Sequence, residues 1–421
     1  MLESTPFRRA LVGLAVTAVT ASTLLVSAPA FGASATVATS SQLATALAAA
    51  KPGDTITLAS GTYSGTFVAA VAGTSSAPIT LSGPRSAVLT TGSTGSGYGL
   101  HVKASNWRLS GFTIATAAKG LVLDNADGTV IDGLDIGSIG QEALHVRTGS
   151  SAVTIRNSVI HDTGLTSAAY GEGIYVGSAN SNWSTIMGSS STPDRSDGVL
   201  IEGNTISNTT AEGIDIKEGT TGGRVIGNTF DRAGFSGANY ADSWIDVKGN
   251  GYVVSGNTGR TALLDAFQVH TAMTGWGNDN SFTSNTIESD VPGLEVSVQK
   301  GATGTVVACD SSEAASGLTN ITCTPATAPS PPPTAIAAPV SSISVSGAAL
   351  AGSTQPLVFT VVANAPAGST VKFKLDGVYL GQDSTAPYSW PVTTTAGSHK
   401  LNARWDANGT TASFDAVFTA R

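Results

Sequence analysis

The sequence predicts an all-β protein, built as a parallel β-solenoid followed by a small β-sandwich. Three observations lead to this prediction. A six-residue motif recurs along much of the chain, residues 340–421 alternate apolar and polar residues in several short runs, and charged residues are scarce. Only 12% of the residues are charged and 49 are glycine, which is typical of a turn-rich β protein rather than a helical one.

The recurring motif has apolar residues at its third and fifth positions and mostly polar residues at its fourth and sixth. This period of two is the pattern of a strand with one buried face. The motifs begin 21, 23, 30, 40, 31, 22 and 27 residues apart, which predicts a coil of about 21 residues with insertions at one corner. Eight copies begin at Tyr98, Lys119, Glu142, Glu172, Glu212, Ser243, Asp265 and Pro292.

An asparagine recurs in the segment that follows several of these copies. Because these asparagines fall at one place in the repeat, we expect their side-chain amides to stack into a hydrogen-bonded ladder in a turn. The predicted ladder consists of Asn157, Asn204, Asn228, Asn257 and Asn285.

Residues 1–35 have the features of a secretory signal. Arg8 and Arg9 precede a 17-residue apolar run, and Ala33-Ser34-Ala35 forms a small-x-small cleavage site. A membrane anchor is the alternative, but the run is short and no later segment resembles a transmembrane helix. We therefore expect a secreted, extracellular protein.

The solenoid is expected to occupy residues 36–323. A short amphipathic helix over Ser41–Ala50, with Ser40 or Ser41 as its N-cap, is predicted to cover the open first coil. Strands and turns then follow, coil after coil, to about Val307.

Two cysteines, Cys309 and Cys323, lie near the end of the solenoid. In an exported chain such a pair is expected to form a disulfide, and metal binding by the pair is the less favoured alternative. Residues 324–339 contain six prolines among Ala, Thr and Ser, a composition that cannot build a core and predicts a semi-rigid linker.

The C-terminal segment, residues 340–421, contains five alternating runs and a hairpin signal at Asp376-Gly377. Strands at this spacing predict a small β-sandwich. In Leu375-Asp376-Gly377 and over Thr385–Trp390 the segment resembles the immunoglobulin-like modules of bacterial secreted enzymes. The resemblance implies a spacer or attachment module without catalytic residues.

Stacking of the coils turns each motif position into a column whose members lie about 4.8 Å apart. Carboxylates and cations then share one outer face of the solenoid, where we expect them to form an exposed strip. The strip comprises Glu142, Glu172, Glu212, Asp215, Lys217, Asp246, Lys248 and His270.

Two interpretations of this strip remain open. It is either a solvated sheet face with weak ion pairs, or a functional site. Like charges stacked on each other, such as Asp215 over Asp246 and Lys217 over Lys248, oppose stability and favour the functional interpretation. The net charge of −8 and the lack of a basic stripe argue against a nucleic-acid partner.

The long insertions beside the strip carry aromatic side chains. Trp183, Phe235 and Tyr240 lie in them, and Trp276 lies in a Gly-Trp-Gly loop just after His270. We expect these rings to be either walls that stack against sugars or anchors of their own loops.

The strip resembles that of the parallel β-helix polysaccharide lyases, which include chondroitinase B and many alginate lyases. In that family one coil carries a Glu followed five residues later by a Lys, and the next coil carries a basic residue at the Lys position. Glu212, Lys217 and Lys248 match this pattern, although Lys248 stands where the family has Arg and Thr210 where it has a second acidic residue. The resemblance implies a right-handed parallel β-helix.

The same resemblance implies roles for the strip. Lys217 would be the Brønsted base that removes the proton beside a uronate carboxylate, and Lys248 its electrophilic or proton-donating partner. A Ca²⁺ ion would neutralise that carboxylate. The implied metal ligands are Glu172, Glu212 and Asp215, and the implied substrate-binding residues are Arg147, Tyr175, Asp215, Asp246, Asp265, His270 and Trp276. The implied partner is an acidic polysaccharide, bound by a monomer.

An ordinary lysine, with a pKa of about 10.4, is a poor base at neutral pH. A second ammonium one coil away and partial desolvation would both lower the pKa of Lys217, whereas Glu212 and Asp215 would raise it. A cation on the carboxylates would cancel their effect on the lysine.

Two other functions remain open. Asp215 and Asp246 in adjacent coils fit the separation of about 5–5.5 Å in a retaining glycoside hydrolase. Glu212 and Asp265, two coils apart, approach the inverting range of about 6.5–9.5 Å. A non-catalytic glycan-binding or adhesive solenoid is the third possibility, because the fold alone does not separate these functions.

Overall fold

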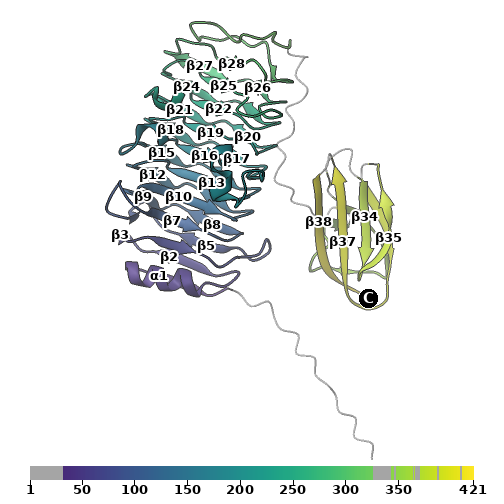
Figure 1. The fold of residues 1–421 in the computed structure, drawn as a ribbon. Helices are drawn as coiled ribbons and strands as arrows, with labels where there is room; N and C mark the ends of the chain where they lie inside the picture. Colours follow the sequence, from purple (N-terminus) through teal and green to yellow (C-terminus); the bar gives the residue numbers. More distant parts are fainter. Residues whose placement is uncertain are drawn as a thin grey trace, which may run out of the picture. The chain divides into compact units, whose positions relative to one another are not determined.

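The structure is a computed structural model that describes residues 32–325, 343–345, 348–363, 365, 370–385, 388–407 and 410–421. The chain divides into two compact units, one up to Ala326 and one from Thr327 onward (Figure 1). The predicted signal up to residue 31 and the predicted linker from residue 326 lie outside the described residues.

The first unit is a parallel β-helix, as predicted. It has three parallel sheets, here named A, B and C, and from β2 onward successive strands along the chain enter different sheets. Sheet A consists of β1 (Ser34–Val37), β2 (Thr55–Leu58), β5 (Ile79–Ser82), β8 (Trp107–Ser110), β11 (Val130–Asp132), β14 (Thr154–Arg156), β17 (Leu200–Glu202), β20 (Arg224–Ile226), β23 (Val253–Ser255), β26 (Ser281–Thr283) and β29 (Val306–Val307).

Sheets B and C have nine strands each. Sheet B consists of β3 (Gly61–Ser64), β6 (Ala87–Thr90), β9 (Thr113–Ala115), β12 (Asp135–Gly137), β15 (Val159–His161), β18 (Thr205–Ser207), β21 (Thr229–Asp231), β24 (Thr258–Arg260) and β27 (Thr286–Ser289). Sheet C consists of β4 (Phe67–Ala69), β7 (Tyr98–Val102), β10 (Lys119–Asp124), β13 (Leu144–Arg147), β16 (Ile174–Val176), β19 (Ile214–Ile216), β22 (Ile245–Val247), β25 (Phe267–Val269) and β28 (Val296–Val298).

Sheet C contains the recurring motif, and its register confirms the predicted alignment of seven copies. Asp215 pairs with Asp246, and Asp246 pairs in turn with Gln268. The alignment of the eighth copy was wrong by two residues, because Ser297 rather than Glu295 pairs with Gln268.

A short helix covers the first coil, where Figure 1 shows it at one end of the stack. Helix α1 (Ser40–Ala49) buries Leu43 and Leu47 against the interior. Its N-cap is Thr39, whose hydroxyl accepts a hydrogen bond from the Gln42 backbone N–H, so the predicted cap, Ser40 or Ser41, was one or two residues too late. Strand β1 begins at Ser34, within the last two residues of the predicted signal.

The remaining helices are single turns in the insertions that precede or follow strands of sheet C. They are η1 (Ala168–Tyr170), η2 (Asn180–Asn182), α2 (Trp183–Ile186) and η3 (Ala238–Tyr240).

The asparagine ladder is present, but Asn157 is not part of it. Asn204, Asn228, Asn257 and Asn285 are linked in turn by bonds from each side-chain amide to the next carbonyl oxygen. Ser158 occupies the ladder position in the preceding coil, where its backbone N–H donates to Asn204 Oδ1. Asn157 instead donates its amide to Asp132 on the surface.

Cys309 and Cys323 form the predicted disulfide, with Cα atoms 5.1 Å apart. It closes the chain after the last strand of sheet A. Among the described residues, no helix is both long and apolar enough to cross a membrane.

The second unit is a two-sheet β-sandwich, which confirms the predicted fold. Asp376 and Gly377 have φ angles of 49° and 84°, so they form the expected hairpin turn between β34 and β35. Its strands are β30 (Ile343–Val345), β31 (Ala348–Ala349), β32 (Thr354–Gln355), β33 (Val358–Ala363), β34 (Thr370–Leu375), β35 (Val378–Asp383), β36 (Tyr388–Thr393), β37 (Gly397–Ala407) and β38 (Thr410–Ala420).

Candidate active site

The centre of sheet C places four polar side chains in one column across β16, β19, β22 and β25. Tyr175, Asp215, Asp246 and Gln268 are consecutive Cα partners in this parallel sheet. Isoleucine, valine or phenylalanine precedes and follows each of them and points into the core. The alternation of the motif therefore sends every column member to the outer face.

The basic side chains that follow these strands pair with the column of carboxylates. Lys217 Nζ lies 2.5 Å from Asp215 Oδ2, and Lys248 Nζ lies 2.9 Å from Asp215 Oδ1. Lys248 Nζ also contacts Oδ2 of Asp246. The other carboxylate oxygen of Asp246, Oδ1, lies 2.7 Å from His270 Nδ1. The result is a continuous chain of alternating charges.

Two expectations about this strip were wrong. The carboxylates are buried rather than exposed: Asp215 is 1% exposed, Asp246 4% and Glu172 4%. The stacked like charges were also expected to oppose stability. Lys248 instead pairs with Asp246 in its own coil and with Asp215 in the neighbouring coil, so opposite charges offset the repulsion within each stack. This pairing and the flanking insertions remove the carboxylates from water, while the Lys217 and Lys248 side chains keep exposures of 12% and 15%.

Three carboxylates form a compact cluster beside this chain of ion pairs. One oxygen each from Glu172, Glu212 and Asp215 lies within 4.8 Å of the others. Oε2 of Glu172 is buried and has no hydrogen-bond partner among the described residues. Carboxylate oxygens are the ligands that Ca²⁺ prefers, so these three residues fit the cation that the sequence resemblance implied.

The environment of this cluster disfavours charge on its glutamates. Burial, together with Asp215, Glu142 and Glu212, raises the pKa of Glu172 well above its usual value. Burial and the nearby aspartates also raise the pKa of Glu212, to about 8. Without a cation, Glu212 therefore favours its protonated form near neutral pH, and the charged form of Glu172 is likewise disfavoured.

Lys217 lies between the cluster and an aromatic ring. Its Nζ is 5.0 Å from the centroid of the Tyr175 ring, and Tyr175 is itself only 8% exposed. Burial alone would lower the pKa of Lys217, but Asp215, Asp246 and Glu212 outweigh burial and raise it. The side chain is thus an ammonium as long as the carboxylates keep their full charge.

Two other expected site residues, Arg147 and Asp265, lie away from this centre. Arg147 donates to Asp124 from Nε at 2.7 Å, two strands from β19 in sheet C. Asp265 accepts hydrogen bonds from Gln268 Nε2 at 2.9 Å and from the Leu294 amide at 2.6 Å, which makes it an anchor of local structure.

The aromatic side chains of the insertions divide into two kinds. Trp183 is 1% exposed and donates its indole N–H to the Ser178 carbonyl, so it anchors its loop. Trp276 is half-buried, with the Arg195 guanidinium 5.9 Å from its ring. Tyr240 is 87% exposed and remains available to a ligand.

Sequence reasoning placed Glu142 in the strip but did not identify His145 and Lys119 as its neighbours in the layer next to Tyr175. The His145 ring lies edge-on to the Tyr175 ring, with centroids 4.4 Å apart, and its Nε2 lies 2.9 Å from the Gly177 carbonyl. Glu142 is ion-paired with Lys119, and although burial opposes it, His145 and Lys119 lower the pKa of Glu142 to about 2. The sequence contained a signal for His145, because it occupies the fourth motif position one coil before Tyr175.

Comparison with known proteins agrees with this geometry. A family model described as a right handed beta helix region matches residues 98–250, and one described as a bacterial Ig domain matches residues 332–403. The crystal structure of an alginate lyase from Paenibacillus sp. str. FPU-7 is 42% identical, with a TM-score of 0.63 over 68% of this chain and 97% of that chain. The chain belongs to the parallel β-helix polysaccharide lyases. The family resemblance inferred from Glu212, Lys217 and Lys248 is thus confirmed.

Two further solved structures match this lyase at lower similarity. A pectate lyase, Pel9A, is 15% identical over 62% of this chain and 70% of its own, with a TM-score of 0.44. A DFA-IIIase from Arthrobacter chlorophenolicus A6 is 12% identical over 66% and 89%, with a TM-score of 0.37. No curated protein matches the lyase in sequence.

Proposed function

We propose that this polysaccharide lyase is a secreted enzyme that cleaves alginate, an acidic uronate polymer, by β-elimination. The observation that supports this substrate is the 42% identity to an alginate lyase that the chain covers over 97% of its length. The paired lysines and the carboxylate cluster on sheet C supply the groups that such a reaction needs.

Lys217 is the proposed base. In β-elimination the base takes the proton beside the uronate carboxylate, the electron pair forms a carbon–carbon double bond, and the glycosidic carbon–oxygen bond breaks. The departing oxygen must then receive a proton. Lys248, a second ammonium held by Asp215 and Asp246, is the proposed electrophilic or proton-donating partner.

The protonated state of Lys217 is the main obstacle to this role, and the neighbouring carboxylates cause it. A Ca²⁺ ion on Glu172, Glu212 and Asp215 would neutralise the substrate carboxylate and cancel the attraction that holds the proton on Lys217. The burial of Lys217 then favours the neutral amine, which is the form that accepts a proton.

Tyr175 is the proposed contact between the base and the sugar. Its ring lies against Lys217 Nζ, so it restricts the ammonium to one side of the cluster. Burial and the neighbouring carboxylates raise the pKa of its hydroxyl well above the usual value, which keeps the hydroxyl a hydrogen-bond donor. At the two ends of the strip, His270 and Arg147 are proposed to attract the anionic polymer.

The hydrolase alternative finds no support in the described contacts. Lys248 Nζ bonds to both Asp215 and Asp246 and so occupies the space where the two carboxyl groups would flank a glycosidic oxygen. In the second candidate pair, Glu212 and Asp265, the Asp265 carboxylate already accepts hydrogen bonds from the Gln268 side chain and from the Leu294 amide.

The test is incubation of the purified protein with alginate, pectate, chondroitin and glucuronan, followed by ultraviolet absorbance of an unsaturated uronate. We expect absorbance to rise with alginate. New reducing ends without absorbance would establish a hydrolase instead, and retention on an alginate column without cleavage would establish a binding protein.

Variants connect the reaction to the site. Lys217→Ala should abolish the absorbance change, and Tyr175→Phe should lower kcat because the hydroxyl is lost while the ring remains. Lys51→Ala, at an exposed lysine near the first coil, is the matched control and should retain activity. Full activity of Lys217→Ala would reject the proposed base.

A further inference from the structure

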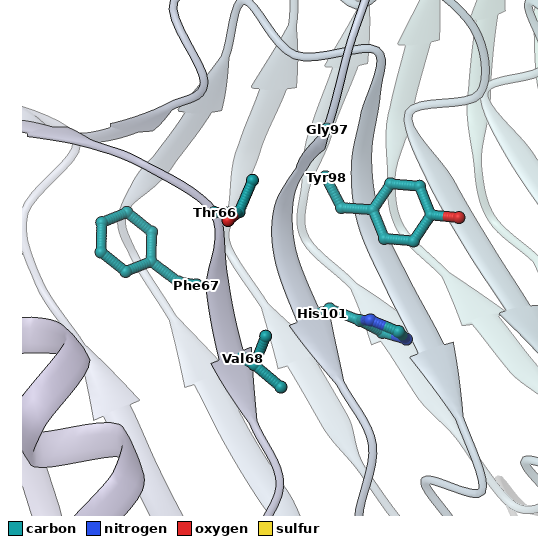
Figure 2. Close-up of a pocket in the computed structure, with 6 residues that line it drawn as sticks. All are labelled: Thr66, Phe67, Val68, Gly97, Tyr98 and His101. Atoms are coloured by element: carbon teal, nitrogen blue, oxygen red, sulfur yellow. The ribbon is translucent and has the colours of Figure 1, made fainter.

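A pocket of about 240 Å³ lies on sheet C, on the face that carries the charged strip but nearer the N-terminal coils. Figure 2 shows Tyr98 and His101 projecting side by side from β7, next to Val68 of β4. Val68 is 44% exposed, so an apolar surface faces water here. The lining residues are Thr66, Phe67, Val68, Gly97, Tyr98 and His101.

Polar contacts fix the side chains that surround this pocket. The Tyr98 and His101 rings meet edge to face, with centroids 5.2 Å apart. His101 Nε2 lies 2.7 Å from Asp124 Oδ2, and Arg147 donates from Nε to Asp124 Oδ1 at 2.7 Å. The Arg147 guanidinium also lies 6.0 Å from the Tyr98 ring centroid. The aromatic wall is therefore preorganised and has a cation beside it.

A second basic residue follows the strand that lines the pocket, two positions after His101, and it has no ion-pair partner among the described residues. Lys103 follows β7 directly and is exposed. Asp124, the nearest acidic residue in its column, is already engaged by His101 and Arg147, and no described residue forms an ion pair with Lys103. An apolar floor, an aromatic wall and a free ammonium together match a uronate ring, which has an apolar face of C–H bonds and one carboxylate.

The pocket and the reaction centre lie on one line. In sheet C, β7 is separated from β19 by four strand steps through β10, β13 and β16. At about 4.8 Å per step the separation is about 19 Å, a distance that an extended polymer of several sugar rings spans.

We propose that this pocket is a distal subsite for a further uronate ring of the same acidic polysaccharide that reaches Lys217. Tyr98 stacks against the ring, and Lys103 pairs with its carboxylate. This inference rests on the proposed lyase function and adds to it a preference for long chains over short oligomers.

The experiment compares kcat/KM for polymeric alginate with kcat/KM for an alginate trisaccharide, which is too short to reach both places. The ratio of the two should fall about 5- to 10-fold in Tyr98→Ala and in Lys103→Gln, because one stacking or ionic contact is lost for the polymer alone. Tyr98→Phe keeps the ring and should retain the ratio. Lys51→Gln, an exposed lysine outside sheet C, is the matched control. An unchanged ratio in both Tyr98→Ala and Lys103→Gln would overturn the subsite.

A binding arm separates this inference from the lyase function. Alginate affinity is measured by calorimetry in the Lys217→Ala protein with and without Tyr98→Ala, and thermal melting confirms that both variants fold. A loss of about 5-fold or more supports the subsite even if the wild-type protein cleaves nothing, and equal affinities overturn it even if cleavage is rapid. Absence of alginate binding by the Lys217→Ala protein and of cleavage by the wild type would reject both proposals.

Discussion

The asparagine ladder gives a prediction whose size follows from the contacts. Asn228 is fully buried. Its Oδ1 accepts from the backbone N–H and from the side-chain amide of Asn204, each at 2.9 Å. Its own amide donates to the Ile201 carbonyl and to Asn257 Oδ1, each at 3.0 Å. Asn228→Ala removes all four bonds.

The cost is set by the buried partners that are left without a bond. The backbone N–H of Asn204 loses its described partner, whereas the Asn204 side-chain amide keeps its bond to the Ile155 carbonyl at 3.0 Å. The Ile201 carbonyl loses one bond, and Asn257 Oδ1 still accepts from the Asn228 amide. A buried unsatisfied polar group costs about 1–3 kcal/mol. The Asn204 N–H is one such group, and the Asn204 side-chain amide and the Ile201 carbonyl each lose one bond, so Asn228→Ala should lower the free energy of unfolding by about 2–4 kcal/mol.

The assay is urea denaturation followed by circular dichroism. Asn157→Ala is the matched control, because Asn157 lies on the surface and its side chain makes a single bond to Asp132 at 2.9 Å. Because Asn157 has a φ of 52°, where alanine is less favourable than asparagine, its cost should be about 1 kcal/mol. The double variant Asn228→Ala/Asn257→Ala should cost less than the sum of the single changes, since the two residues share a bond. A cost for Asn228→Ala no larger than that of Asn157→Ala would refute the reasoning.

Three further predictions concern the end of the solenoid and the cation. Burial and Asp310 raise the pKa of Glu295 to about 7. The unfolded chain releases that proton near pH 4.3, so between these values the folded state binds more protons and stability falls as pH rises. Glu295→Gln should abolish this fall, and at pH 8 its free energy of unfolding in urea titrations should exceed that of the wild type by about 1–3 kcal/mol. A variant with the same dependence of stability on pH as the wild type would contradict this. Replacing Cys309 and Cys323 by serine opens a loop with a sequence separation of 14 residues and should lower the free energy of unfolding by about 3 kcal/mol. An unchanged midpoint of urea unfolding would contradict this. Chelation should abolish alginate cleavage and added Ca²⁺ should restore it, whereas full activity after exhaustive chelation would show that no cation takes part.

The register of sheet C was predictable because two independent periods coincide. Alternation within each motif identified the inward residues, and the spacing of about 21 residues identified the partner coil. A one-residue error would have sent Ile214 and Ile216 to water, so the apolar pattern permitted only one alignment around Asp215.

The errors in register arose where the local pattern permits more than one alignment. Glu295 lies in a run in which Leu294, Val296 and Val298 are all apolar, so a shift of two residues keeps the same face buried. Contact with Phe267 selects Val296. In the asparagine ladder, Ser158 occupies in one coil the position that asparagine occupies in the others. The neighbouring residue, Asn157, was therefore wrongly aligned with the ladder asparagines.

The burial of the site was not predictable from the sequence. It depends on how far Lys217 and Lys248 reach across neighbouring strands, and on the paths of insertions whose sequences have no period. The motif placed the charged residues in columns, but their pairing along diagonals is a property of side-chain length and of the spacing of strands.

Two carboxylates of the site have no cationic partner among the described residues, and they are the basis of the last prediction. Asp215 is paired with Lys217 and Lys248, and Asp246 with Lys248 and the His270 ring, but the cluster also contains Glu172 and Glu212. Neither glutamate forms an ion pair with a described residue, so on folding each must either keep a buried charge without a partner or take up a proton, and both are costly. A sheet selected for stability alone would not retain them.

We therefore expect the double change Glu172→Gln/Glu212→Gln to raise the melting temperature of the protein in chelator by several degrees, equivalent to at least about 1 kcal/mol. The same change should remove the stabilisation that Ca²⁺ gives the wild-type protein, because ligand binding to the folded state alone raises its stability. Asp242→Asn, at a half-buried carboxylate outside the cluster that accepts from Gln268 Nε2 at 2.7 Å, is the control and should keep the Ca²⁺ response. If the double variant is less stable in chelator than the wild type, the two glutamates serve the fold and the cation site must lie elsewhere.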